Sequence, residues 1–368
     1  MRIIFDHQIF SLQRYGGVSR YFCEISKNIK CFDHVTTNIV APLYVNEYLE
    51  KINSNSVLGM QIRQIPRSAR IIISINNILS AILFKFYRNV DIFHETYYTR
   101  ADNCPSLSKR IVTVYDMIHE KFPESFRAND KTREAKAVAV HRADHVICIS
   151  ESTRNDLIDL LGVPREKTSV TYLGYSLSVD TPAAIPSVIV KPYLLYVGQR
   201  AGYKNFEGLL RAYSASAALS TEFDLVCFGG GDLTAREFSL ADELKLPRNS
   251  IHLVTGDDSI LAGLYVHATV FVYPSLYEGF GIPPLEAMSF GCPVACANTS
   301  SLPEVVGNAA ELFDPLDVAA MSAAIESVAL SSDRARELVA RGRERLSHFS
   351  WEKCARDTLE VYKNVLRR

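Results

Sequence analysis

The chain has 368 residues, 48% of them hydrophobic, which is enough for two domains with separate cores. Its 40 lysines and arginines balance 41 aspartates and glutamates, which argues against nucleic acid as the main partner. No apolar run is long enough for a secretory signal or a membrane span, so we expect a cytoplasmic protein. Eight scattered cysteines without zinc-site spacing indicate reduced thiols and no metal.

Short runs of β-branched and aromatic residues recur along the chain, and most are separated by stretches of helical period. The runs are residues 2–5, 33–41, 90–95, 110–116, 144–150, 193–198, 223–229, 250–256, 268–274 and 292–297. Strands that alternate with helices indicate parallel sheets covered on both faces. We therefore predict an α/β fold with two doubly wound, Rossmann-like domains that face a central cleft, where the ligand lies beyond the carboxyl ends of the strands.

A segment rich in proline, serine and alanine separates the two sets of strands. We predict an N-terminal domain over residues 1–176, a linker over 177–192 and a C-terminal domain over 193–349. Residues 350–368 have the pattern of an amphipathic helix that begins with a serine cap. We expect this last helix to pack back toward the N-terminal domain.

Two glycines, Gly16 and Gly17, follow the first strand in "FDHQIFSLQRYGGVSRYF" and open a predicted helix over residues 16–30. Glycines at the carboxyl end of a strand can form a backbone cradle for phosphate. The stretch "RYGGVSR" lacks the G-x-G-x-x-G pattern of nicotinamide-binding folds.

The stretch from Lys51 to Val90 contains no acidic residue. Basic residues gather around "IIISINNILSAILFKF" within it, namely Lys51, Arg63, Arg67, Arg70, Lys85 and Arg88. A basic amphipathic helix here could rest on anionic lipid and meet a lipid-linked saccharide. The alternative is an ordinary helix whose apolar face packs on the sheet.

The stretch "YVGQRAGYKN" places Gly198, Arg200 and Lys204 between a strand and a helix predicted over residues 205–219. Cations at a helix start oppose the helix dipole unless an anion neutralises them, and a diphosphate would supply that anion. The alternative is two solvated charges.

The loop "YEGFGIPPLE" carries Glu278 and Glu286 on either side of glycines and prolines. Gly279 and Gly281 let the backbone approach a ligand, and Pro284 suits the first position of a helix that Gly291 ends. Two carboxylates beside a diphosphate could accept hydrogen bonds from a sugar and from a ribose, which indicates a sugar nucleotide. The alternative is that Glu286 complements the helix dipole and Glu278 is a solvated turn residue.

The loop "EGFGIPPLE", the spacing of Arg200, Lys204 and Asn205, and "YGGVSRY" together resemble the retaining glycosyltransferases of family four, which have the two-domain GT-B fold. The similarity covers nearly the whole chain. Within that family, "YEGFGIPPLEAMSFGCPVACANTSSLPEV" is most similar to bacterial mannosyltransferases that build O-antigen and other surface polysaccharides. The resemblance implies a nucleotide-sugar donor, with GDP-mannose the nearest, and a saccharide acceptor. If the basic helix rests on anionic lipid, that acceptor would be lipid-linked.

The resemblance also implies roles for individual residues. Arg200 and Lys204 would hold the donor diphosphate, and Glu286 would bind the ribose hydroxyls. Other positions implied at the donor are Glu278 with the amides of Gly279, Phe280 and Gly281 for the sugar, Gly16 and Gly17 for the phosphate, and Gly256 and Tyr265 for the base. The motif "TVYDMIHEKFP" places Asp116 and His119 in the region facing the sugar, although Tyr115 stands where many members have a histidine.

Retention of configuration needs no side-chain base, because the diphosphate oxygen can take the acceptor proton. Cations and glycine amides would stabilise the departing phosphate, and no Asp-x-Asp motif is present, so we expect no metal requirement. Three alternatives stay open. They are transfer from another GDP-, UDP- or dTDP-sugar, a two-lobed sugar-binding protein without catalysis, and a sugar-nucleotide epimerase whose acid and base side chains would be His94, Glu95, Asp116 and His119.

Overall fold

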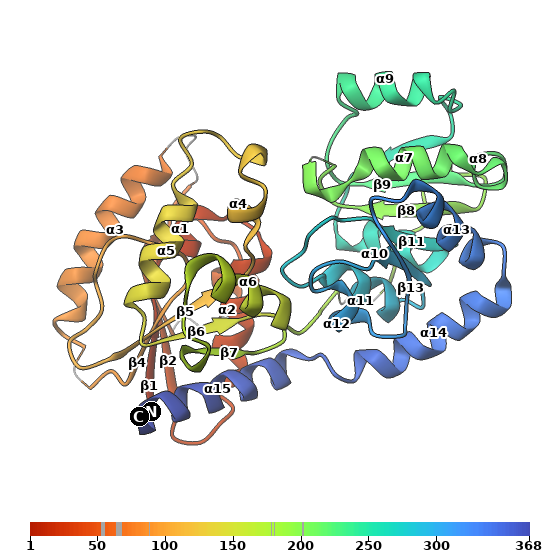
Figure 1. Cartoon of the computed structure of the whole chain (residues 1–368). Helices are drawn as coiled ribbons and strands as arrows, with labels where there is room; N and C mark the ends of the chain where they lie inside the picture. The colour runs from red at the N-terminus through yellow and green to blue at the C-terminus, as the bar shows by residue number, and fades with distance from the viewer. Residues whose placement is uncertain (53–55, 64–67, 88, 178, 180, 201) are drawn as a thin grey trace. The chain divides into compact units, whose positions relative to one another are not determined.

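The computed structural model describes all residues except 53–55, 64–67, 88, 178, 180 and 201 (Figure 1). The chain forms two compact units. Unit 1 contains Met1–Gly174 and Ser350–Arg368, and unit 2 contains Tyr175–Phe349. The described residues of 177–192, the predicted linker, form no helix or strand. Part of that segment is fixed to unit 2, because Ala183 donates a hydrogen bond to the carbonyl of Ser259.

Unit 1 is built on a parallel sheet of seven strands in the order β3-β2-β1-β4-β5-β6-β7. The strands are β1 (Arg2–Phe5), β2 (Thr36–Tyr44), β3 (Val57–Gln61), β4 (Ile92–Glu95), β5 (Lys109–Val114), β6 (His145–Cys148) and β7 (Thr168–Val170). Central strands such as β1 and β6 are almost wholly buried, as expected for a sheet covered on both faces.

Helices cover this sheet. They are α1 (Gln8–Leu12), α2 (Gly17–Ile29), α3 (Ala69–Phe84), α4 (Ile118–Lys121), α5 (Thr132–Arg142), α6 (Glu151–Leu161) and α15 (Trp351–Arg367). The last helix, α15, begins at the Ser350 cap and packs against α2. Its Tyr362 hydroxyl lies 2.6 Å from Nδ1 of the buried His94, which ties the end of the chain to the sheet.

Unit 2 contains a parallel sheet of six strands in the order β10-β9-β8-β11-β12-β13. The strands are β8 (Tyr193–Val197), β9 (Asp224–Phe228), β10 (Ile251–Val254), β11 (Val270–Tyr273), β12 (Val294–Ala297) and β13 (Glu311–Phe313). The helices are α7 (Phe206–Ala215), α8 (Ala217–Glu222), α9 (Ala235–Glu243), α10 (Asp258–His267), α11 (Ile282–Ser289), α12 (Leu302–Val306), α13 (Val318–Ala329) and α14 (Ser332–Leu346).

The two predicted Rossmann-like sheets are confirmed, with two differences in detail. Three short strands, β3, β7 and β13, were not predicted, and all three lie at sheet edges. The helix predicted over 205–219 is divided into α7 and α8, because Ser216 leaves the helical conformation and its side chain caps α8.

Each sheet has one point at which the chain changes direction along the sheet. In unit 1 this switch point lies between β1 and β4, and in unit 2 it lies between β8 and β11. Ligands of open α/β sheets bind beyond the carboxyl ends of the strands at such points. The loops after β8 and β11 contain Lys204 and Glu278, while Asp6 and Thr96 follow β1 and β4.

Candidate functional site

Lys204 and Glu278 meet at the switch point of unit 2. Lys204 ends a single helical turn (Gly202–Lys204) after β8, and Glu278 lies in the loop after β11. The Lys204 ammonium is 2.6 Å from a Glu278 carboxylate oxygen and 3.4 Å from the Tyr273 hydroxyl. The two side chains are 19% and 10% exposed, so the pair is desolvated but can be reached from outside. The sequence analysis assigned Lys204 to the diphosphate of a donor and Glu278 to its sugar, and the structure places these two side chains in direct contact.

The loops that carry this pair are bonded to each other. The amide of Leu276 donates to the carbonyl of Tyr203 at 2.7 Å. The side-chain amide of Asn205 donates to the carbonyls of Pro274 and Pro315. These bonds fix the spacing between the Lys204 loop and the Glu278 loop before any ligand arrives.

Two serines after β12 hold the glycine loop in shape. Ser300 accepts a hydrogen bond from the Glu278 amide at 2.9 Å. Ser301 donates to the carbonyls of Glu278 and Phe280 at 2.9 and 2.8 Å, and the Phe280 ring is buried. Gly281 has φ +106, a conformation that suits glycine, and an added Cβ would lie 2.7 Å from Leu302. The loop over Gly279, Phe280 and Gly281 is thus rigidly supported.

Helix α11 starts earlier than predicted, which moves Glu286. The prediction placed Pro284 at the first helical position and Glu286 in the first turn, but the helix begins at Ile282 and its first turn holds no acidic residue. Glu286 is half-buried on α11, and its charge adds to burial in raising the pKa of Tyr265 far above its usual range. Glu286 therefore lies near Tyr265 rather than at the helix start.

Gly256 and Tyr265 differ in accessibility. Gly256 is exposed in the turn before α10, whereas Tyr265 is fully buried, with its ring stacked on Phe290. The Tyr265 hydroxyl is buried without a hydrogen-bond partner. Of the two, only Gly256 can line an open pocket by itself.

Arg200 does not present a free cation, contrary to the prediction. Its side chain is 3% exposed, and the guanidinium donates to the carbonyls of Gly229, Gly230, Gly231 and Asp232. Its Nε lies 3.3 Å from a carboxylate oxygen of the buried Glu237. The physical reason is the turn after β9, where three successive glycines with positive φ aim their carbonyls at one point. Arg200 fills that point, so its contacts in this structure are structural.

In unit 1, Gly16 and Gly17 form the start of α2. Gly16 is the N-cap of α2 and offers no side chain to cap it, and Gly17 is exposed with open space where a Cβ would stand. The start of α2 therefore has no side-chain cap, which is a suitable arrangement for an anion.

Asp116 and His119 follow β5, and a buried lysine holds this segment. Lys136 on α5 is fully buried and donates to the carbonyl of Asp116 at 2.8 Å and to the Glu120 carboxylate at 2.7 Å. The Asp116 carboxylate accepts from the Ile118 amide and stays partly exposed. His119 stacks on Phe126 at 3.9 Å, and burial followed by the Lys136 charge lowers its pKa. Asp116 is therefore the more available of the two.

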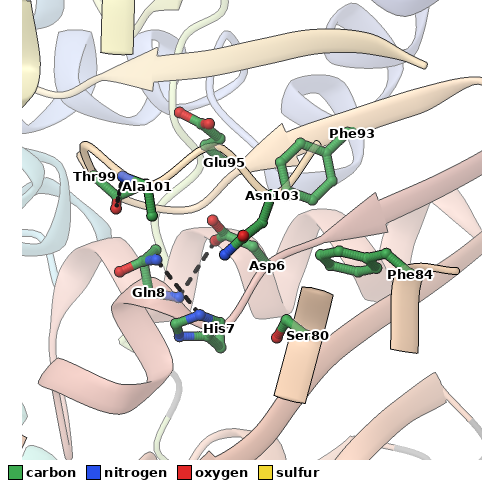
Figure 2. Close-up of a pocket in the computed structure, with 10 residues that line it drawn as sticks. All are labelled: Asp6, His7, Gln8, Ser80, Phe84, Phe93, Glu95, Thr99, Ala101 and Asn103. Atoms are coloured by element: carbon green, nitrogen blue, oxygen red, sulfur yellow. Dashed lines mark hydrogen bonds between the residues drawn. The ribbon is translucent and has the colours of Figure 1, made fainter. Parts of the chain in front are cut away.

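A small polar cavity lies at the switch point of unit 1 (Figure 2). Asp6, His7 and Gln8 line it from the end of β1, and Ser80 lines it from α3. Thr96 donates to the Asp6 carboxylate through its amide and its hydroxyl, at 2.8 and 2.5 Å. Burial raises the pKa of Asp6 to about 6 and lowers the pKa of His7 to about 4. The cavity has room for little more than a water molecule, so it cannot hold a sugar.

Glu95 lines the same cavity from the end of β4. Arg142 donates to one of its oxygens at 2.7 Å, and the other oxygen is buried without a hydrogen-bond partner. Burial and then the Asp6 charge raise the pKa of Glu95 to about 7, against the opposite effects of Arg142 and Arg110. A larger polar pocket of unit 1 is lined by Arg14, Val45, Glu47, Gln61, Ile62 and Arg63.

Sequence reasoning missed several of these residues. Tyr273, the last residue of β11, lies beside Lys204 and Glu278, and its place directly before the acidic loop was an available signal. Lys136 and Ser301 gave no signal, because their contacts depend on elements distant in the sequence. Among the described residues no group of three His, Cys, Asp or Glu side chains is placed to hold a metal ion.

Family models match both halves of the chain. The model of "Glycosyltransferase Family 4" matches residues 15–179, and that of "Glycosyl transferases group 1" matches residues 185–345. The chain is 34% identical to the O-antigen chain mannosyltransferase B of Escherichia coli, over 70% of this chain and 71% of that protein. It is 28% identical to the E. coli serotype-specific mannosyltransferase WbdA, over 73% of this chain and 34% of that longer protein.

Solved structures share the fold. Sucrose-phosphate synthase from Thermosynechococcus elongatus has a TM-score of 0.76 at 21% identity, covering 100% of this chain and 99% of that one. Anabaena HepE in complex with UDP has a TM-score of 0.70 at 16% identity, covering 99% of this chain and 100% of that one. At these identities the likeness establishes the fold alone.

Arg200→Gln should lower the free energy of unfolding by about 3–5 kcal/mol, because it leaves the Glu237 charge buried without its partner. Chemical denaturation measures this change. Lys191→Ala, which alters an exposed cation of the same unit, is the control and should be nearly neutral. An Arg200→Gln protein that unfolds like the wild type but transfers no sugar would instead support the role predicted from the sequence.

Glu95→Gln should change how stability depends on pH. Between about pH 4.5 and 7 the folded protein keeps a proton on Glu95 that the unfolded chain has lost, so the contribution of Glu95 to stability falls as pH rises. The stability of the wild type relative to the variant should therefore fall by up to about 3 kcal/mol across this range. Urea denaturation at several pH values measures it, with the exposed Glu124→Gln as control. A pH-independent difference would contradict the prediction.

Proposed function

Because this chain belongs to the family 4 glycosyltransferases with the GT-B fold, we propose that it transfers mannose from GDP-mannose, with retention of configuration, to a lipid-linked saccharide. The product would be an O-antigen or another bacterial surface polysaccharide. The names of the relatives support mannose as the transferred sugar. Another GDP-, UDP- or dTDP-sugar is the alternative donor.

The ion pair of Lys204 and Glu278 carries the proposal. The pair lies at the switch point, where the ligand of such a sheet binds, and its nearest core contact is with the neutral hydroxyl of Tyr273. A donor diphosphate would attract Lys204 more strongly than one carboxylate does, because it carries more negative charge. Lys204 would then bind the diphosphate, and the released Glu278 would accept hydrogen bonds from the sugar hydroxyls.

The surrounding groups suit the rest of a sugar nucleotide. The backbone of Gly279, Phe280 and Gly281 would contact the sugar, and its rigid support by Ser301 means that little ordering is needed on binding. Glu286 would bind the ribose. Gly256 would line the base pocket, with Tyr265 beneath it.

Catalysis would be mainly electrostatic. As the bond to the sugar breaks, negative charge grows on the diphosphate, and Lys204 would stabilise it. The amides of Gly16 and Gly17 would contribute from unit 1. The departing phosphate oxygen would take the proton of the acceptor hydroxyl, so no side-chain base is needed. Asp116, held by Lys136, would orient the transferred sugar, and His119 would flank it.

The acceptor and the site of action follow from the proposed product. A lipid-linked saccharide is presented at a membrane, so the enzyme would act in the cytoplasm at the inner face of that membrane. In the described part of the chain, no helix has the length and apolarity needed to cross a bilayer. Peripheral contact would therefore bring the protein to its acceptor.

The structure removes two of the four acid and base candidates of the epimerase alternative, His94 and Glu95. His94 is buried between Tyr362 and Thr113, at 2.6 and 2.9 Å, and burial lowers its pKa to about 3. Glu95 is buried against Arg142. Neither group is available as an acid or base for a sugar. The family match argues equally against a sugar-binding protein without catalysis.

Lys204→Ala should reduce kcat/KM with GDP-mannose by about 10²–10³, the range for losing a group that stabilises a growing negative charge. It should also weaken binding of GDP alone. Glu278→Gln should abolish most transfer but keep GDP binding, because it frees Lys204 and removes only the sugar contact. Mannose transfer and calorimetric titration with GDP measure the two effects.

The control is Lys191→Ala, which removes a cation of unit 2 that donates to the Thr221 carbonyl instead. It should leave both measurements unchanged. Transfer at the wild-type rate by both the Lys204 and the Glu278 variants would overturn the assignment of the site.

Transfer should continue in EDTA, because in the proposed complex Lys204 and the backbone amides would stabilise the charge of the diphosphate without a metal ion. Initial rates before and after chelation, with magnesium and manganese added back, measure this. Activity that disappears in EDTA and returns with manganese would contradict a metal-independent reaction.

A further inference from the structure

Helix α3 differs from an ordinary surface helix, because polar residues share its buried face and its outer face carries large apolar side chains. Asn76 and Ser80 are buried against the domain, together with Ile72 and Phe84. Large apolar side chains point outward instead: Ile71 is 64% exposed, Ile75 40%, Ile78 64%, Leu79 37%, Ile82 49%, and Phe86 just beyond the helix 79%. Surface helices normally place their apolar stripe against the core. The sequence alternative, an apolar face packed on the sheet, holds in part, because Phe84 packs in a core cluster with Ile4 and Phe93 of the sheet. The outward apolar side chains form a second sector that this packing does not cover.

Polar contacts hold the inner face of α3 in place. The side chain of Asn76 donates to the Leu43 carbonyl and the Ser11 hydroxyl, at 2.7 and 2.8 Å, and accepts from the Leu43 amide. Asn77 Oδ1 lies 3.2 Å from Nε2 of His7. These bonds fix the rotation of α3, so the apolar face cannot turn inward. The exposure of the isoleucines is thus imposed by the fold.

The outer face divides into an apolar sector and a basic rim. At about 100° per residue, Ile78, Ile71, Ile82, Ile75, Phe86 and Leu79 follow one another over roughly 100° of the helix surface. Arg70 and Lys85, with Ser74 and Ala81 between them, occupy the adjacent sector and are exposed. Arg63 is also exposed in the segment before α3. Arg67 and Arg88 from the sequence hypothesis lie outside the described residues.

We infer that the outer face of α3 docks on an anionic phospholipid bilayer, with its apolar sector in the interface and Arg70 and Lys85 at the phosphates. An apolar sector bordered by basic residues is the pattern of helices that lie in a membrane surface. No acidic residue between Lys51 and Val90 opposes the attraction to anionic lipid. A second copy of this face would bring like charges together, which disfavours self-association.

This inference rests on the proposed function in one respect: the contact of α3 with the bilayer would bring the enzyme to its lipid-linked acceptor. The binding of α3 to lipid does not depend on which sugar is transferred. Figure 1 shows α3 at the periphery of unit 1. Substitutions on the outer face of α3 leave Lys204, Glu278 and the glycine loop unchanged, because these belong to unit 2.

Sedimentation of the full chain with vesicles of phosphatidylcholine, with or without phosphatidylglycerol, tests the inference. The wild type should bind the anionic vesicles and bind less at high salt. Ile78→Glu/Ile82→Glu should reduce binding by roughly tenfold or more, because exposed apolar area is lost. Arg70→Glu/Lys85→Glu should reduce binding to anionic vesicles by about tenfold or more.

Matched controls separate this surface from general effects. Leu160→Glu/Leu330→Glu changes two exposed leucines elsewhere, and Arg343→Glu/Arg356→Glu reverses two exposed charges elsewhere. Both should bind vesicles like the wild type. Thermal unfolding should be unchanged in all four variants, since every altered side chain is at least partly exposed. As a direct reporter, Ile78→Trp should show a blue shift of emission with anionic vesicles only.

Three outcomes would overturn the inference. They are no vesicle binding by the wild type, undiminished binding by Ile78→Glu/Ile82→Glu, and a wild-type dimer that this variant dissociates. Transfer to a water-soluble acceptor analogue distinguishes the two proposals, because it should be normal in the α3 variants. Vesicle binding through α3 without transfer from any sugar nucleotide would refute the proposed function and leave the docking surface standing.

Discussion

The change of strand direction between β8 and β11 decides which side chains of unit 2 can act together. These strands are neighbours in the sheet, but the chain leaves them for different helices, so their following loops border one crevice. Lys204 and Glu278 lie 74 positions apart in the sequence and are joined there at 2.6 Å. Because the pair is partly exposed and bonded to no deeper charge, a ligand can replace either partner without leaving a charge buried in the core.

Arg200 shows why position in a loop does not determine function. It lies four positions before Lys204 in the same loop, but its side chain turns toward β9, the other neighbour of β8. The glycines after β9 direct their carbonyls at the guanidinium, and Glu237 supplies the opposite charge. Most N–H groups of the Arg200 guanidinium are therefore hydrogen-bonded within the protein. The two cations that follow β8 therefore differ in role: Arg200 is held within the protein, and Lys204 can bind a ligand.

The central part of the fold could be predicted from the sequence, and the edges could not. Central strands such as β8 and β11 are buried on both faces and appear as continuous apolar runs. β7 and β13 have only three residues each, and β3 is largely exposed, so none gives such a run. In the site, the loops were found from their glycines and charges. The pairing of Lys204 with Glu278 and the support by Ser301 depend on tertiary contacts, which one sequence does not reveal.

The buried polar residues of α3 and the polar cavity of unit 1 occur at the same place. At the switch point between β1 and β4, the inward face of α3 carries Asn77, which lies beside His7, and Ser80, which lines the cavity. Ile72 and Phe84 also face inward, while the other large apolar residues of the helix face outside. A helix is about 10–12 Å across, side chains included. If the outer face of α3 lies in a bilayer, the carboxyl ends of β1 and β4 are held about one helix diameter from the lipid. A saccharide attached to a membrane anchor would then need to extend only that distance to reach the edge of the sheet where ligands bind.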